Sequence, residues 1–190
     1  MSSQPATTPS VAWCLPAGAL AAAGCSLLLM RPQLLRASSN PTATIVVVFV
    51  ALLAVGLAWP VAREHAVPVR TTVLVVGLGI AAFAIGRLIG GGTAPTSPTA
   101  KIIALNTLAA VAEEAFFRRL VYSALAPSGA AIAITGSALL FALVHLTVYG
   151  AWVLPIDLAA GLVLGWQRWA TGSWRAPAIT HAAANLLVVI

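Results

Sequence analysis

The sequence has few charged residues and almost no acidic ones. Only 7% of its 190 residues are Asp, Glu, Lys or Arg, and just four of these are acidic. A soluble domain carries about 25% charged residues. Instead, 61% of the residues are hydrophobic and the mean hydropathy is +1.00. This balance excludes a sizeable soluble domain and predicts an integral membrane protein.

Cysteines and N-terminal basic residues are also scarce. The two cysteines, Cys14 and Cys25, lie eleven positions apart in one apolar run, too far to bridge each other on a helix. We interpret them as small apolar side chains. No Lys or Arg precedes this run, so we expect a retained first segment and no cleaved signal peptide. The basic residues never cluster beyond Arg118-Arg119, which argues against nucleic acid as a partner.

Long apolar runs dominate the sequence. A membrane-spanning helix needs ~20 residues, and open strands cannot satisfy their backbone in lipid. The fold class predicted is therefore all-α, a polytopic transmembrane bundle of about seven helices in contact with the lipid bilayer. The apolar runs are 11–30, 44–62, 71–90, 102–125, 130–149, 151–169 and 174–190.

A stretch rich in Gly, Pro, Thr and Ser, 90–100, separates two groups of these runs. The three runs before it are plain, whereas the four runs after it carry polar residues. We therefore predict an N-terminal unit, 1–100, of transmembrane helices and linker, and a C-terminal four-helix catalytic core, 101–190.

Two carboxylates and two guanidiniums interrupt the fourth run, at Glu113, Glu114, Arg118 and Arg119. A charge at mid-helix costs ~2.5–3.5 kcal/mol of insertion free energy. The charges of this segment therefore cost on the order of 10 kcal/mol, and its apolar neighbours contribute only ~6 kcal/mol in favour of insertion. These groups therefore need partners inside the bundle. Glu114 and Arg118 are four apart, which predicts an ion pair. Glu113 is turned about 100° away and is left to face something else.

Two histidines lie inside later apolar runs. His145 shares a helix face with Phe141, and His181 shares one with Asn185, because each pair is four residues apart. Ionisable groups at membrane depth face the bundle interior or a water cavity. We therefore expect Glu113, His145, His181 and Asn185 to surround one wet pocket. Polar contacts that merely join helices rarely need two histidines and an unpaired carboxylate.

The chemistry that suits this set is hydrolysis. A glutamate in an apolar pocket can act as general base on water, and a histidine can polarise that water or carry its proton. A second histidine and an asparagine amide can donate hydrogen bonds to an oxyanion. The same glutamate and two histidines could instead hold Zn²⁺. No HExxH pair is present, and spacing leaves both possibilities open.

Three short motifs occur in a fixed order within these predicted helices. They are Glu113-Glu114-x-x-x-Arg118, Phe141-x-x-x-His145 and His181-x-x-x-Asn185. Together they resemble the CPBP intramembrane proteases, a family that includes type II CAAX prenyl proteases and bacterial bacteriocin-immunity and abortive-infection proteins. The resemblance covers about 101–190 and leaves the first three runs uncovered.

The resemblance implies an intramembrane endopeptidase that acts on a membrane-associated peptide or protein. It assigns water activation to Glu113 and His145, support of the oxyanion to His181 and Asn185, and ordering of the site to Glu114, Arg118 and Phe141. A metal-independent glutamate mechanism is favoured, with a metalloprotease as the alternative, in which Glu113, His145 and His181 would bind zinc. The small size and the Ala, Val, Leu and Arg usage suggest a bacterial plasma-membrane protein.

Two other function classes stay open. A proton-coupled transporter could use Glu113 and the histidines as a relay, although the internal repeats common in transporters are not found. A non-catalytic immunity or scaffold protein could bind a peptide in the same pocket.

Four further predictions concern single residues. Asp157 is expected in the first turn of the sixth helix, where the helix dipole favours a carboxylate, with a site-facing role as the alternative. Gly161 and Gly165 predict a close contact between helices. Arg119 is expected to extend to a membrane interface, and His65 to be a solvated loop residue.

Overall fold

The computed structural model describes residues 14–58, 67–90 and 99–189. All elements in these residues are helical, which confirms the predicted fold class. The predictions for residues 1–13, for His65 and for most of the 90–100 linker lie outside the described residues. The elements are α1 (Cys14–Ala37), α2 (Pro41–Ala58), α3 (Val69–Gly90), α4 (Ala100–Glu114), η2 (Ala115–Val121), α5 (Tyr122–Leu125), η3 (Ala126–Ser128), α6 (Ala130–Tyr149), η4 (Ala151–Val153), α7 (Leu154–Thr171) and α8 (Arg175–Val189).

The described residues form seven long helices when α4, η2 and α5 are taken as one rod, 100–125. Four helices in the described residues are long and apolar enough to cross a membrane, namely Pro16–Ala37, Pro41–Ala58, Val69–Gly90 and Ala130–Tyr149. Helices α4 and α8 fall outside this group because each has only 15 residues. The rod as a whole also carries five charged side chains, at Lys101, Glu113, Glu114, Arg118 and Arg119. The rod and α8 therefore depend on the surrounding apolar helices for their place in a membrane.

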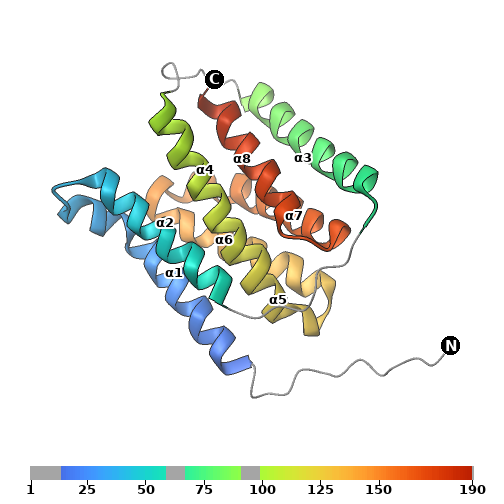
Figure 1. The fold of residues 1–190 in the computed structure, drawn as a ribbon, viewed down its shortest axis with the longest axis horizontal. Coiled ribbons are helices and arrows are strands. Elements are labelled where there is room, and N and C mark those ends of the chain that lie inside the picture. The colour runs from blue at the N-terminus through green and yellow to red at the C-terminus, as the bar shows by residue number, and fades with distance from the viewer. Residues whose placement is uncertain (1–13, 59–66, 91–98, 190) are drawn as a thin grey trace.

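The rod runs through the middle of the molecule (Figure 1). Helices α1 and α2 lie on one side of it, and α8 and α3 lie on the other, with α6 and α7 behind. Helix α2 packs against α4 and η2, α8 packs against α4, and α1 reaches α6. Every other helix thus contacts the rod or a helix that does.

Small residues let the helices approach closely at several places. A Cβ on Gly161 would lie 2.9 Å from the Cα of Ala138, and one on Gly165 would lie 3.2 Å from a side-chain carbon of Ile134. The predicted close contact of α7 is confirmed, with α6 as its partner. A Cβ on Gly56 of α2 would lie 2.6 Å from the backbone of η2, so this segment is held tightly as well.

The rod differs from the regular helix predicted over 102–125, because η2 is a seven-residue π-helix. At its end the Tyr122 N–H donates to the Phe117 carbonyl, five residues back. Adjacent side chains on this wider turn are rotated by less than the 100° of an α-helix. Phe116, Phe117 and Arg118 can therefore all point inward, and all three are fully buried. The π-helix begins directly after Glu113 and Glu114.

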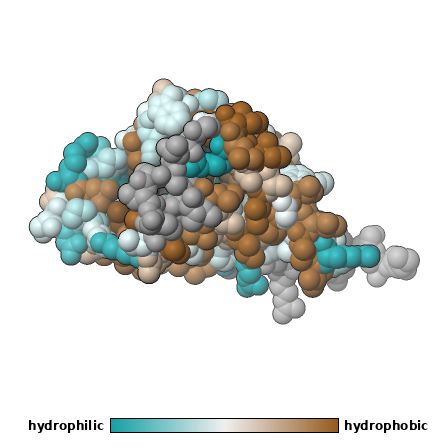
Figure 2. Space-filling view, turned by 90° about the horizontal axis from the view of Figure 1, so that it is seen from above, coloured by the Kyte–Doolittle hydropathy of each residue, from teal (hydrophilic) through white to brown (hydrophobic). Residues whose placement is uncertain are grey.

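Large apolar side chains cover much of the outer surface. Leu88 and Ile89 of α3 are 81% and 82% exposed, and exposed valines and leucines continue along α2 and α3. Figure 2 shows broad apolar areas on one face of the molecule, with polar residues gathered toward its ends. This surface is that of an integral membrane protein, whose apolar residues face lipid.

Candidate active site

Every acidic and every histidine side chain that the structure describes belongs to one cluster. Three of them come from the rod and α6, and two come from α7 and α8. They are Glu113, Glu114, His145, Asp157 and His181. Groups that are far apart in the sequence, on four segments, thus meet at one place inside the bundle.

Glu113 is the centre of the cluster. Its Oε1 lies 3.9 Å from Nε2 of His145, and its Oε2 lies 3.9 Å from Nε2 of His181. These distances are too long for direct hydrogen bonds and suit a bridging water. The carboxylate is nearly buried, with 6% of its side chain exposed. The predicted meeting of this glutamate with both histidines is therefore present in the fold.

Glu114, the residue after Glu113, forms a fully buried ion pair with Arg118. Glu114 Oε2 is 3.3 Å from Nε of Arg118, and both side chains are completely buried. Arg118 also donates from Nη2 to the Gly161 carbonyl of α7, at 3.2 Å. The other carboxylate oxygen, Oε1, accepts a 2.9 Å hydrogen bond from Nδ1 of His181. The i,i+4 pairing predicted from the sequence is present, and it anchors a histidine on another helix.

The contacts at Nδ1 define the form of each imidazole. His145 Nδ1 lies 2.7 Å from the Phe141 carbonyl, which can only accept, so this nitrogen carries the proton. His181 Nδ1 donates to Glu114 in the same way. In a neutral imidazole the other nitrogen is then an acceptor. When the imidazoles are neutral, both Nε2 atoms therefore present lone pairs toward Glu113, a tautomer assignment that rests on the hydrogen-bond partners.

Phe141 is the aromatic centre around which the cluster is packed. Its ring centroid lies 4.6 Å from that of His145 and 5.8 Å from that of His181. The Arg118 guanidinium lies over the same ring at 5.3 Å. A ring in contact with both imidazoles and with the buried cation restricts the rotation of all three.

Asn185 lies one helical turn beyond His181 on α8. Its side-chain amide donates to the backbone carbonyl of Asn106 on α4, at 3.3 Å. The amide thus joins α8 to α4. The remaining predicted site residues gather at Glu113.

Sequence reasoning missed Arg31 of α1. Its Nη1 lies 3.9 Å from Oε1 of Glu113, and 12% of its side chain is exposed. No spacing rule connects it to Glu113, which is 82 positions further along the chain. Only the packing of α1 reveals this contact.

Asp157 fits both of the interpretations considered for it. It lies in the first turn of α7, as predicted. Its Oδ2 is also 3.8 Å from Nδ1 of His145, and this buried oxygen has no hydrogen-bond partner among the described residues. The carboxylate can therefore balance a positive charge on that imidazole. Tyr149, 53% exposed, stacks on the other side of His145 with the rings 5.9 Å apart.

Two other polar side chains hold the helices together. Gln167 is fully buried, and its amide donates to the Val75 carbonyl at 2.8 Å and to the Thr180 hydroxyl at 2.9 Å, which joins α3, α7 and α8. Arg119, expected at an interface, donates to the Gly56 carbonyl in the last turn of α2, at 2.6 Å. The Arg119 side chain therefore binds the backbone of α2.

Glu113, His145 and His181 are the residues that would bind a zinc ion. Zinc ligands lie ~2.0–2.2 Å from the ion, which places neighbouring donor atoms about 3.3 Å apart. Here the two Nε2 atoms face different oxygens of Glu113, each at 3.9 Å. Across residues 14–58, 67–90 and 99–189, no three His, Cys, Asp or Glu side chains are arranged to hold a metal. The side chains as placed do not fit a preformed three-ligand site.

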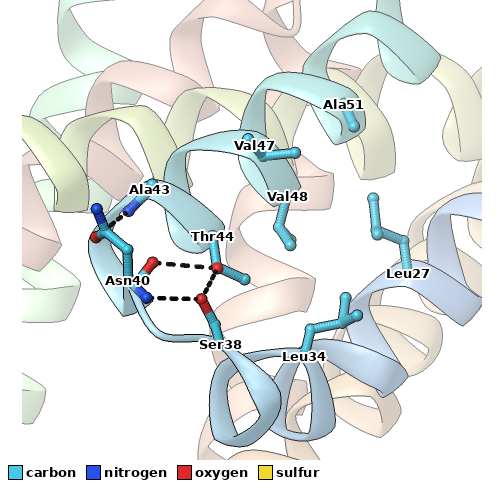
Figure 3. Close-up of a pocket in the computed structure, with 9 residues that line it drawn as sticks. All are labelled: Leu27, Leu34, Ser38, Asn40, Ala43, Thr44, Val47, Val48 and Ala51. Carbon is cyan, nitrogen blue, oxygen red and sulfur yellow. Dashed lines mark hydrogen bonds between the residues drawn. The ribbon is translucent and has the colours of Figure 1, made fainter.

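A cavity of about 310 Å³ lies elsewhere, between α1 and α2 (Figure 3). Its polar end is fixed by hydrogen bonds, such as the 2.6 Å bond from Thr44 to Ser38. No residue of the cluster lines it, and it holds no titratable side chain, so we assign it no chemistry. Its lining is Leu27, Leu34, Ser38, Asn40, Ala43, Thr44, Val47, Val48 and Ala51.

Comparison with known proteins gives one result. The family model described as type II CAAX prenyl endopeptidase Rce1-like matches residues 95–187. No curated protein and no solved structure matches the chain. The matched region contains the rod, α6, α7 and most of α8, and therefore all five residues of the cluster, whereas Arg31 lies outside it. It supports the general description of a CAAX-protease-like intramembrane endopeptidase, and the similarity of this segment is consistent with the CPBP proteases.

Proposed function

We propose that the chain hydrolyses a peptide bond with a water activated by Glu113 and His145. The observation that carries the proposal is the cluster itself. Of the chain's four acids, three meet two histidines inside an otherwise apolar bundle. Intramembrane ionisable groups are expensive and mark function.

The burial of the cluster divides it into two layers. The Glu114–Arg118 pair is fully buried and cannot reach a substrate. Glu113, His145 and Asp157 keep between 6% and 16% of their side chains exposed. The fully buried layer orients the other side chains of the cluster, and the partly exposed layer is accessible to water and to a peptide.

The reaction proceeds by proton transfer around Glu113. A water between Oε1 of Glu113 and Nε2 of His145 gives its proton to one of these bases while its oxygen attacks the peptide carbonyl carbon. The C–N bond then breaks, and the same proton passes to the departing amine. Asp157, 3.8 Å from Nδ1 of His145, balances the imidazolium whenever His145 carries the proton.

The formal charge of the cluster fits this proton handling. Three carboxylates and the guanidiniums of Arg31 and Arg118 give −3 + 2 = −1 when both histidines are neutral. One additional proton makes the cluster neutral. A buried cluster one proton from neutrality can accept the water's proton without building up excess charge.

The substrate class follows from the family description and the surroundings. We propose a membrane-associated peptide or protein, with the prenylated class named by the family as the first candidate, cleaved in a bacterial plasma membrane that the chain crosses several times. The mechanism is of the glutamate type, with no nucleic acid involved. We propose that the helices within 1–100 surround a catalytic unit formed by 101–190.

The decisive experiment compares membrane-protein termini in cells that lack the protein and carry either the wild type or Glu113→Gln. Gln has the shape of Glu but cannot take a proton. Peptide ends that appear only with the wild type establish proteolysis and identify the substrate. Identical termini, at equal protein levels, refute the proposal and favour a proton-coupled transporter or a peptide-binding immunity protein, which proton-flux and ligand-capture assays separate.

A peptide assay tests the substrate class. A quenched fluorescent peptide with a farnesylated Cys near its C-terminus is compared with the same peptide without the lipid. Cleavage of the first alone supports prenyl recognition. Equal cleavage of both peptides shows that the protein does not recognise the lipid.

A further inference from the structure

The π-helix leaves one backbone carbonyl of the rod without a partner inside the rod. Its last bond joins the Tyr122 N–H to the Phe117 carbonyl, and a later α-helical bond joins the Ala126 N–H to the Tyr122 carbonyl. Between these two bonds, the three N–H groups of residues 123–125 lie opposite the four carbonyls of residues 118–121. One carbonyl is therefore left over, and a buried carbonyl needs a donor from another part of the protein.

Arg168, in the last turn of α7, supplies this donor. Its Nε donates to the Arg118 carbonyl at 3.0 Å. Its guanidinium carbon lies 5.2 Å from the ring centroid of Tyr122, the residue whose N–H closes the π-helix. A guanidinium is always charged, and its flat shape suits a carbonyl at one edge and an aromatic ring at one face. Arg168 thus binds the rod at the place where the π-helix ends.

Helix α7 holds Arg118 at a second point. The Arg118 side chain donates from Nη2 to the Gly161 carbonyl, at 3.2 Å. Gly161 and Arg168 are seven residues apart, about two helical turns, and therefore lie on the same face of α7. The backbone and the side chain of Arg118 are both bound to this face. Arg118 in turn pairs with Glu114, which accepts the hydrogen bond from His181.

The form of the rod decides where Arg118 points. In an α-helix, successive side chains are rotated by about 100°, so Phe116, Phe117 and Arg118 would span about 200° of the helix surface. One of the three would then turn away from the bundle interior. In the π-helix all three are fully buried. The bond from Arg168 therefore stabilises the only one of these two forms that buries the cation together with both rings.

We propose that Arg168 is a positioning residue for the reaction, an inference that rests on the proposed function. By binding the carbonyl that the π-helix leaves over, Arg168 fixes Arg118 and Glu114, and through them His181. Nε2 of His181 faces Oε2 of Glu113 across 3.9 Å. Loss of Arg168 should therefore misalign the reacting groups and lower kcat more than it changes KM, because small displacements at a reacting centre strongly reduce the rate.

The test uses the full chain, purified, and a peptide that spans the bond identified by the comparison of termini. Arg168→Met removes the donor and keeps apolar contact with Tyr122. We expect kcat to fall ~10²-fold with KM within about threefold of wild type. Arg168→Lys restores a charged donor and should recover at least about tenfold of this loss. Arg175→Met, at the exposed arginine that begins α8, is the matched control and should leave both constants unchanged.

A second substitution separates positioning from a general loss of folded protein. Glu114→Gln keeps an acceptor for His181 but removes the ionic bond to Arg118, so it interrupts the connection through which Arg168 acts. The double variant Glu114→Gln, Arg168→Met should therefore have a kcat within about threefold of Glu114→Gln alone. A smaller folded fraction would instead multiply the two losses. Multiplied losses, or no recovery in Arg168→Lys, would overturn the proposal.

Failure of the proposed function is distinguishable from failure of this inference. If the wild type cleaves nothing that Glu113→Gln does not, the proposed function fails and the role of Arg168 fails with it. If the wild type is active and Arg168→Met is equally active, only the role of Arg168 fails. Should Arg168→Met not fold, Arg168→Gln is polar but shorter and uncharged, and wild-type kcat in that variant would overturn the proposal.

Discussion

Replacing Arg118 by Met should destabilise the protein far more than a surface change would. Arg118 and Glu114 are both completely buried, with 3.3 Å between Nε and Oε2. Removing one member of a buried pair leaves an uncompensated charge and costs ~3–5 kcal/mol. Met nearly fills the same space and can still pack on the Phe141 ring that now lies 5.3 Å from the guanidinium. The loss should therefore be electrostatic in origin.

A double-mutant cycle measures that origin. Glu114→Gln removes the stranded charge and keeps an oxygen for the His181 Nδ1–H. The double variant should be more stable than Arg118→Met alone, with a coupling free energy at the upper end of ~0.5–3 kcal/mol. Unfolding free energies are measured in lipid discs by steric trapping. Additive effects of the two changes would refute the account of a sealed, mutually neutralising pair.

Three shorter predictions follow from the same geometry. Asp157→Asn should lower kcat ~10²-fold or less at nearly constant KM, because the imidazolium of His145 loses its balancing charge; an unchanged kcat would leave Asp157 with a helix-end role only. Gly161→Leu should lower the free energy of unfolding by ~1–3 kcal/mol, since even its Cβ would lie 2.9 Å from Ala138. Gly86→Ala is the control, because the space around Gly86 is open and the change should cost no more than a surface substitution. Equal unfolding free energies of the two variants would contradict the close contact. Dialysis against a strong chelator, monitored by elemental analysis, should leave kcat unchanged, and loss of activity restored by Zn²⁺ would instead establish a metalloprotease.

The parts of the site that were predictable are those that one helix determines by itself. The i,i+4 spacing predicted the pair of Glu114 with Arg118, and small residues four apart predicted the contact at Gly161. Both depend on helical periodicity, which needs no knowledge of the rest of the fold. The all-α fold class followed from the requirement that backbone groups be satisfied in lipid.

The parts that were not predictable depend on tertiary contacts. The π-helix has no local signal, because it results from the need to bury Phe116, Phe117 and Arg118 together. Arg31 reaches Glu113 only through the packing of α1. The acceptor of the His181 Nδ1–H could not be assigned either, since Glu114 and His181 lie on different helices.

The hydrogen bond from His181 to Glu114 also constrains how the protein is made. The two residues are 67 positions apart, and synthesis at ~5–20 residues per second separates their emergence from the ribosome by roughly 3–13 s. During this interval Glu114 has Arg118 on the same rod as its partner but does not yet have His181. We therefore expect the rod to remain beside the ribosome, or beside an insertion factor, until the last helix arrives. A chain that stops before α8 should be held there and degraded, so its turnover reports on assembly as well as on folding.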